Sequence, residues 1–189
     1  ASPNAFTSTA ITGYYFESTE KFEENLKILL SFVSVPWFTK ESVDKEQGII
    51  GQEIRMIEDD PENQVFYGML EALYEHNPVR VSIAGTVESI AEITAETLYA
   101  CHAAFYNPGN MTLCVAGNVD PRRVCEIARE VLPKEGLRDI PRDYGGEEPE
   151  QAFRPETVRE MAVSTPIFQL GWKADPAPLG EEHMRRQFI

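Results

Sequence analysis

The sequence lacks long hydrophobic runs, disulfide-type cysteine patterns and clustered basic charge, and each absence narrows its function. No apolar run approaches the roughly 18 residues that a membrane-spanning helix requires. The first ten residues, ASPNAFTSTA, have no basic head and no apolar middle, so they do not resemble a secretory signal. The three cysteines, Cys101, Cys114 and Cys125, form no Cys-x-x-Cys pair. They indicate reduced, mostly buried thiols of a cytoplasmic protein, not a disulfide framework or a zinc cluster.

Basic residues are scarce. The chain has 17 Lys and Arg against 31 Asp and Glu, which gives a formal net charge of -14. Nucleic acids and anionic membrane surfaces both attract clustered Lys and Arg, so we expect neither as a partner. The hydrophobic content of 42% still supports a packed core.

The first two thirds of the chain predict strands followed by amphipathic helices. The Thr-rich and aromatic start around Gly13 is typical of a pair of short strands. Periodic apolar residues and capping residues such as Thr39, Asp60-Pro61 and Asp120-Pro121 predict the helices. We expect helices over 18–33 (capped by Ser18 or Thr19), 40–60, 61–76, 94–106 and 121–132, and a further strand over 110–119.

Residues 134–158 change in composition. Pro, Gly and charge dominate, and no apolar period continues, so this stretch predicts a linker between domains. Beyond it we expect two strands separated near Ser164–Pro166, followed by the start of a helix. About thirty residues cannot form an independent domain. We therefore expect the chain to be a fragment of a longer protein.

The stretch KEQGIIGQE, residues 45–53, places two acids on one predicted helix. At about 100° per residue, Glu46 and Glu53 lie about 20° apart around the helix and roughly 10 Å apart along it. Four apolar residues fall within about 80° of Glu46 on the same wheel: Val43, Ile50, Ile54 and Ile57. Both acids are therefore predicted inside the apolar stripe, with Gly48 and Gly51 on the opposite side.

An unpaired carboxylate in an apolar environment loses several kcal/mol of hydration. Two explanations follow from the wheel alone. Glu46 and Glu53 serve a metal site, one as a ligand and the other as a support, because their separation prevents both from ligating one small ion. Alternatively, they lie at the edge of the stripe and reach water or an Arg.

Six stretches occur in a recognisable order: NAFTS at 4–8, YYF at 14–16, FEENLKILLSFV at 22–33, KEQGIIGQEI at 45–54, HNPVRVSIAGTVESI at 76–90 and FYNPGNMTLCVAGNVD at 105–120. Together they resemble the pitrilysin/insulinase family of zinc metallopeptidases, which includes the mitochondrial processing peptidase and many bacterial intracellular members. The resemblance runs over residues 1–132 and more weakly over 159–189.

The resemblance implies a zinc peptidase site. In the family, a His-x-x-Glu-His motif supplies two zinc ligands and a general base, and a later helix supplies a third ligand, Glu, supported by an acid seven residues earlier. By that match Glu53 resembles the zinc ligand and Glu46 the supporting acid of the catalytic site. Three ligands and a water leave zinc an open position for catalysis.

The histidines depart from the family pattern. His76, His102 and His183 do not form His-x-x-Glu-His, and in LGEEH at 179–183 Leu179 stands in the first His position. In the family the motif precedes NAFTS by a few tens of residues, so we expect it to lie before Ala1. We expect Zn2+ in the longer parent protein, an unoccupied site in this chain, and no cleavage by this chain alone.

NAFTS implies a second role. In the family this stretch is an exposed edge strand to which a substrate peptide adds as another strand. Asn4, Ala5, Phe6 and Thr7 are therefore expected to bind substrate, with Phe6 helping to form a side-chain pocket. The alternative from composition is an ordinary core strand, or one that a missing segment covers.

The expected fold is α+β, an antiparallel-dominated sheet with helices packed on one face. Residues 1–133 would form most of a first peptidase-type domain, 134–158 the linker, and 159–189 the opening of a second similar domain. The expected function is that of a fragment of a zinc metalloendopeptidase acting on unstructured peptides. The alternatives are a non-catalytic, substrate-binding partner subunit of the same family and an unrelated acidic helical scaffold. Besides peptide, we expect self-association, as a homodimer or through exposed apolar surface.

Overall fold

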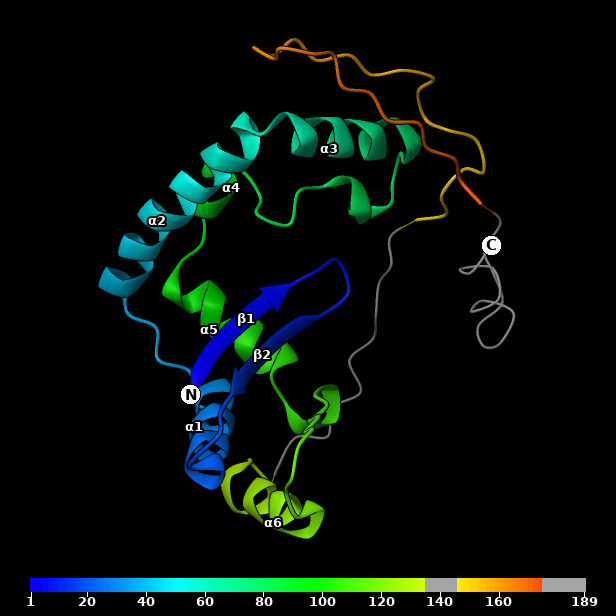
Figure 1. Cartoon of the computed structure of the whole chain (residues 1–189). Coiled ribbons are helices and arrows are strands. Elements are labelled where there is room, and N and C mark those ends of the chain that lie inside the picture. The colour runs from blue at the N-terminus through cyan, green and yellow to red at the C-terminus, as the bar shows by residue number, and fades with distance from the viewer. Residues whose placement is uncertain (135–145, 175–189) are drawn as a thin grey trace. The chain divides into compact units, whose positions relative to one another are not determined.

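The computed structural model describes residues 1–134 and 146–174 (Figure 1). Its elements in chain order are β1 (Ser2–Thr7), β2 (Thr12–Glu17), α1 (Phe22–Ser34), α2 (Lys40–Asp59), α3 (Pro61–Leu73), the 3-10 turn η1 (Pro78–Arg80), α4 (Val87–Ala91), α5 (Ala95–Phe105), the 3-10 turn η2 (Pro108–Asn110) and α6 (Pro121–Val131). Among the helices of these ranges, none has both the length and the hydropathy to cross a bilayer.

The chain divides into two compact units, and the division passes through α2. Unit 1 comprises residues 1–51 and the described part of 86–143. Unit 2 comprises residues 52–85 and the described part of 144–189.

The predicted strand pair at the start of the chain is confirmed. β1 and β2 are antiparallel, with Ser2 opposite Glu17 and Thr7 opposite Thr12. The turn between them closes with the Ser8 N–H donating to the Ile11 carbonyl at 2.8 Å. Gly13 lies opposite Phe6, and any side chain at Gly13 would collide with the Phe6 ring.

The core of unit 1 forms where α1 packs against α6. Leu26 and Leu30 of α1 meet Val124 and Ile127 of α6, and all four are buried. α6 begins as predicted, with the Asp120 side chain accepting from the Arg122 N–H at 2.9 Å and with Pro in the first turn. The predicted cap of α1 is wrong. Lys21 precedes its first turn in a left-handed conformation and makes no side-chain capping bond, so neither Ser18 nor Thr19 caps the helix.

An aromatic cluster joins β2 to α5 within unit 1. The hydroxyl groups of Tyr14 and Tyr106 are 2.7 Å apart, and the His102 ring stacks on Tyr106 with centroids 4.8 Å apart. His102 Nε2 lies 2.9 Å from the Val33 carbonyl oxygen, which only an N–H can contact favourably, so the proton is on Nε2. Burial, together with the bond to Tyr14, raises the pKa of Tyr106 to about 12.

Unit 2 is organised around α3. The helix starts with the Asp60 side chain accepting from the Glu62 N–H at 3.1 Å, as the Asp60-Pro61 pair predicted. Leu70 and Leu73 are buried. Residues 146–174 form no helix or strand, yet two of their N–H groups, those of Phe153 and Arg154, donate to the carbonyls of Leu73 and Ala72 at 3.2 and 2.8 Å.

The expected antiparallel-dominated sheet is wrong in extent, since the described residues are mostly helical with one two-stranded hairpin. Residues 110–119 form no strand, and Leu113 and Val115 are exposed there. The two strands expected around Ser164–Pro166 are also absent from the described part of the chain. A strand needs a neighbour for its N–H and C=O groups, and no described segment pairs with these two stretches.

The expectation that the cysteines are mostly buried is wrong, since Cys101, Cys114 and Cys125 are all exposed.

Other expectations fall partly outside the described residues. The helix expected near 179–189, with His183, lies outside them, as do residues 135–145 of the predicted linker. The domain boundaries stay a prediction.

Candidate functional site

Helix α2 carries both candidate acids and begins where the sequence predicted. The Thr39 Oγ1 accepts from the Ser42 N–H at 3.1 Å, and the Ser42 Oγ accepts from the Thr39 N–H at 3.0 Å. These reciprocal bonds satisfy two N–H groups at the helix start, where no intrahelical acceptor exists.

One face of α2 is fixed by a glutamine. Gln47 Nε2 donates to the carbonyl oxygens of Ile90 and Ile93, both at 2.8 Å. On the same face Gly51 is buried, and a Cβ at Gly51 would lie 4.0 Å from Ile90 Cδ1. The prediction that Gly51 lies opposite the buried side of the helix is therefore wrong, since Gly51 and Gln47 share the packed side.

Glu46 and Glu53 are exposed. The prediction that they lie inside the buried stripe is therefore wrong, and the alternative at its edge holds. The buried side of the helix, which includes Val43, Gly51 and Ile54, is centred about 90° from Glu46 on the wheel. Among the described residues neither carboxylate takes part in an ion pair or a side-chain hydrogen bond.

The chemistry open to these acids follows from the helix that carries them. Two exposed carboxylates, roughly 10 Å apart along one helix, can each offer oxygen ligands but cannot share one small ion. Within residues 1–134 and 146–174, no group of three or more His, Cys, Asp or Glu side chains is arranged to hold a metal. The described residues therefore do not complete a zinc site, and the roles of Glu46 and Glu53 stay predictions.

Strand β1 is exposed along its whole length, and among described elements it pairs only with β2. Ser8 and Ile11 form a hydrogen-bonded pair across the hairpin, and hydrogen-bonded and non-hydrogen-bonded residue pairs alternate along the two strands from there. The N–H groups of Ala5 and Thr7 therefore face away from β2. The Asn4 Oδ1 accepts from the Ala5 N–H at 2.8 Å. An ordinary core strand is thus not what these residues form here.

The candidate acids and the candidate edge are not brought together by direct bonds. No hydrogen bond or ion pair of the described residues joins Glu46 to residues 4–7. Phe6 is 52% exposed, and its ring contacts Tyr15 on the neighbouring strand, with centroids 6.4 Å apart. Binding of substrate by residues 4–7 stays a prediction.

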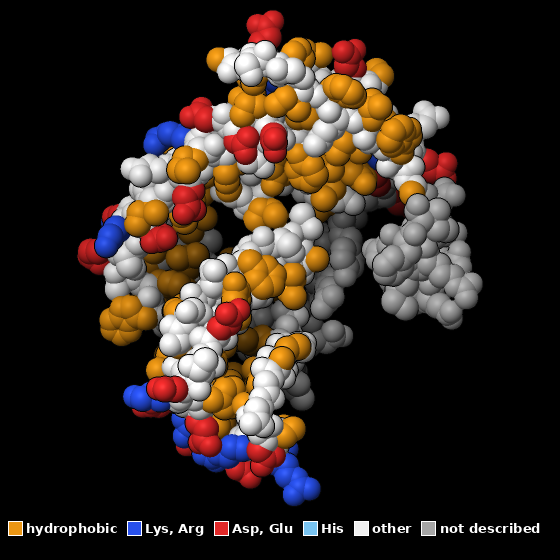
Figure 2. All heavy atoms as spheres, viewed as in Figure 1, with side chains coloured by type: hydrophobic (Ala, Val, Ile, Leu, Met, Phe, Trp, Pro, Cys, Tyr) orange, Lys and Arg blue, Asp and Glu red, His pale blue; other side chains and the backbone are white. Residues whose placement is uncertain are grey.

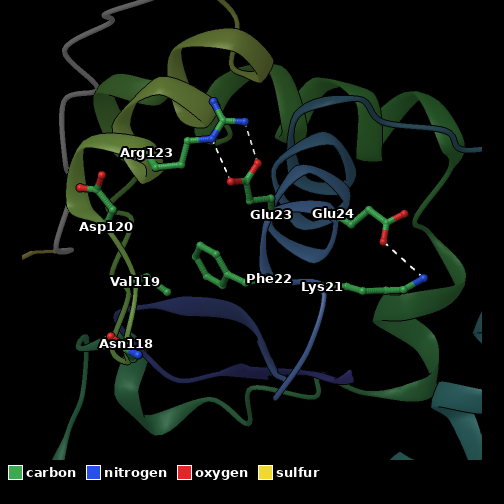
Figure 3. Close-up of a pocket in the computed structure, with 8 residues that line it drawn as sticks. All are labelled: Lys21, Phe22, Glu23, Glu24, Asn118, Val119, Asp120 and Arg123. Atoms are coloured by element: carbon green, nitrogen blue, oxygen red, sulfur yellow. Dashed lines mark hydrogen bonds and ion pairs between the residues drawn. The ribbon is translucent and has the colours of Figure 1, made fainter.

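A hollow of about 500 Å³ lies elsewhere in unit 1, between the first turns of α1 and α6 (Figure 3). Arg123 donates through two nitrogens to the Glu23 carboxylate, at 2.9 and 2.6 Å, and Lys21 pairs with Glu24 at 3.5 Å. The Arg123 guanidinium holds the pKa of Glu23 below its ordinary value. Both cations of the lining are paired, so this hollow links two helices and offers no unpaired cation to a ligand.

The family models match nearly the whole chain. One, described as "Insulinase (Peptidase family M16)", matches residues 1–87, and another, described as "Peptidase M16 inactive domain", matches residues 92–186. The chain belongs to the M16 (insulinase/pitrilysin) peptidase family. The resemblance drawn from the six sequence stretches is confirmed.

Relatives of this M16 chain are longer. "Uncharacterized zinc protease YmfH" of Bacillus subtilis is 44% identical over 190 residues, which cover 99% of this chain and 44% of the relative. "Uncharacterized zinc protease ML0855" of Mycobacterium leprae is 32% identical over 128 residues, 67% of this chain and 29% of the relative. The chain thus spans less than half the length of these proteins.

Solved structures agree on the fold. The crystal structure of an M16-like peptidase from Alicyclobacillus acidocaldarius is 38% identical with a TM-score of 0.73, over 80% of this chain and 36% of that one. A protease from Helicobacter pylori gives a TM-score of 0.71 at 22% identity, over 78% of this chain and 37% of that one, and supports the fold alone.

Replacing Gln47 with Leu tests the anchoring of α2. The substitution leaves the Ile93 carbonyl without a described donor and leaves the Ile90 carbonyl with backbone donors alone, such as the Ile93 N–H at 3.1 Å. This loss is expected to lower the free energy of unfolding by about 1–3 kcal/mol. Gln52→Leu, the same change at an exposed position of α2, should alter it by less than about 0.5 kcal/mol. Urea denaturation followed by circular dichroism measures both. Equal effects of the two substitutions would show that the Gln47 bonds do not anchor the helix.

Proposed function

We propose that this chain is the part of an M16 zinc protease that supplies one zinc ligand, its supporting acid and a peptide-binding strand edge. Glu53 is the ligand, Glu46 the support, and β1 the edge. The histidine ligands come from a His-x-x-Glu-His segment of the longer protein. The reaction is hydrolysis of peptide bonds in unstructured peptides.

One observation carries the proposal for the acids. Gln47, Gly51 and Ile54 commit one side of α2 to packing, so the side that bears Glu46 and Glu53 stays accessible. No described cation occupies either carboxylate. Both acids are thus available to a segment that brings a metal, and the zinc-protease names of the relatives favour this use.

The edge of β1 supports the substrate proposal. An extended peptide would pair with the outward N–H and C=O groups of Ala5 and Thr7. Pairing to the main chain alone places few demands on the peptide's sequence. At Ala5 the incoming carbonyl would replace the Asn4 side chain as acceptor.

The 189-residue chain alone should have no peptidase activity. It contains no His-x-x-Glu-His segment, and a zinc ion held by one carboxylate would be bound weakly. The measurement is turnover of an unstructured fluorogenic peptide with added Zn2+, with and without a chelator. Chelator-sensitive turnover by this purified chain would overturn this part of the proposal.

Glu53 and Glu46 can be tested separately in the complete gene product that contains these residues. Glu53→Gln should remove a ligand, so zinc content by mass spectrometry and peptidase activity both fall to near background. Glu46→Gln should weaken metal affinity or activity by about 10- to 100-fold, as losses of supporting residues do.

Glu58→Gln, an exposed position on the same helix, is the matched control and should leave zinc and activity unchanged. Full zinc content and activity in Glu53→Gln would refute the assignment. If the unaltered complete protein binds peptide but holds no zinc and cleaves nothing, the substrate-binding partner subunit replaces the enzyme as the function.

The edge role of β1 has its own test in the same complete protein. Thr7→Pro removes an outward N–H and spares the ladder to β2, so KM for peptide should rise about 2- to 10-fold, the value of one main-chain hydrogen bond. Thr12→Pro removes the equivalent outward N–H from the opposite edge of the hairpin and should leave KM unchanged. Zinc content should not change in either variant. An unchanged KM in Thr7→Pro would argue against peptide addition at this edge.

A further inference from the structure

Residues 148–173 of unit 2 form a loop whose two ends lie next to each other. Glu148 and Lys173 lie 25 positions apart in the sequence, and their side chains form an ion pair at 2.7 Å. Both are largely buried, with side-chain exposures of 17% for Glu148 and 10% for Lys173. Charges in such surroundings persist only where hydrogen bonds replace the lost water.

The Glu148 carboxylate accepts hydrogen bonds from three consecutive backbone N–H groups that follow α3. Its Oε1 accepts from the Glu75 N–H, and its Oε2 accepts from the N–H groups of His76 and Asn77, all at 2.8 Å. Burial alone would raise the pKa of Glu148, but the Lys173 ammonium and these three donors outweigh it and lower the pKa to about 2.

The Lys173 ammonium group also has a hydrogen-bond acceptor for each of its donors. Its ammonium group has three N–H donors, and its Nζ has three acceptors: Glu148 Oε1 at 2.7 Å, the Pro149 carbonyl at 2.6 Å and the Gln151 carbonyl at 2.9 Å. It also lies 5.1 Å from the centre of the Tyr74 ring. All three donors of the ammonium are used, so Lys173 is held against Glu148 and residues 149–151.

Between these ends, the segment lies along α3. Arg159 donates to Gln64 and pairs with Glu71 at 2.8 Å. A Cβ at Gly171 would lie 2.7 Å from Leu73 Cδ1 and 2.8 Å from Met69 Sδ, so the backbone at Gly171 rests directly on the helix.

A hollow of about 840 Å³ remains between α3 and this segment. Figure 2 shows hydrophobic side chains gathered at the surface around α3. Four residues near the end of the segment are exposed and apolar: Ile167, Phe168, Leu170 and Trp172. No described strand ladder holds the segment in place, so its side-chain contacts and the two bonds to the Leu73 and Ala72 carbonyls hold it.

We propose that Glu148 and Lys173 form a clasp that closes residues 148–173 into a strap over α3, and that breaking this ion pair releases the strap. The clasp joins the two ends of a 26-residue loop, so the favourable free energy of this one ion pair offsets the entropy lost on closing the loop. Without it, the remaining contacts with Leu73, Ala72, Gln64 and Glu71 would act on a segment whose two ends are no longer joined to each other. Opening of the strap would uncover the apolar side of α3.

Trypsin cleavage after Arg159 in native buffer tests the clasp, because the rate reports how often the strap opens. Glu148→Gln keeps the shape and removes the charge, and Lys173→Met removes the partner. Each should accelerate cleavage after Arg159 at least about 10-fold, the scale of a charged hydrogen bond lost. The double variant should be no faster than either single one, since both break the same interaction.

Glu150→Gln, an exposed acid two residues from Glu148, is the matched control and should cleave at the wild-type rate. Hydrogen exchange of α6 amides in unit 1 should be unchanged in all variants, which separates strap opening from general unfolding. An unchanged cleavage rate in Glu148→Gln, or single effects that add in the double variant, would overturn the proposal.

Discussion

The placement of α2 depends on the side chain of Gln47. An amphipathic helix buries one of its sides. In α2 the side that is buried carries the Gln47 amide, which donates to the carbonyls of Ile90 and Ile93. Without the Gln47 amide the half-buried Ile93 carbonyl would lose its described donor, and an acceptor left unpaired away from water costs free energy. The bonds therefore rotate the buried side of α2 toward Gln47 and Gly51, and they leave Glu46 and Glu53 accessible.

Unit 2 uses the same physical device with donor and acceptor exchanged. The backbone after α3 presents N–H groups that no regular element satisfies, and the Glu148 carboxylate accepts three of them. In both units a single polar side chain bonds to backbone groups more than forty residues away in the sequence. Such contacts explain how residues 146–174 keep a defined backbone conformation without forming a strand.

Local signals predicted the elements that depend on local physics. Three helices start where the sequence predicted, because a helix cap needs only neighbouring residues. Their caps are Asp60-Pro61, Asp120-Pro121 and the reciprocal hydrogen bonds of Thr39 and Ser42. Residues 110–119 have a strand composition but form none among the described residues, since pairing depends on a partner that composition cannot specify. Gln47 was missed for a similar reason: its acceptors lie more than forty residues away. The one available signal was Gly51 on the same side of the wheel, where a small residue allows close approach.

The exposure of Glu46 and Glu53 changes the reason for assigning them to a metal site. If they were buried, the cost of desolvation would itself demand a cation, and that argument fails because both side chains meet water. The family assignment does not depend on it, since the matching models cover residues 1–87 and 92–186. An exposed carboxylate also keeps its hydration until a ligand arrives, so a segment carrying histidines and zinc would meet a preformed helix with no competing ion pair among the described residues. The physical requirement thus moves from burial to rigidity, and rigidity is what the bonds of Gln47 supply to the first turns of α2.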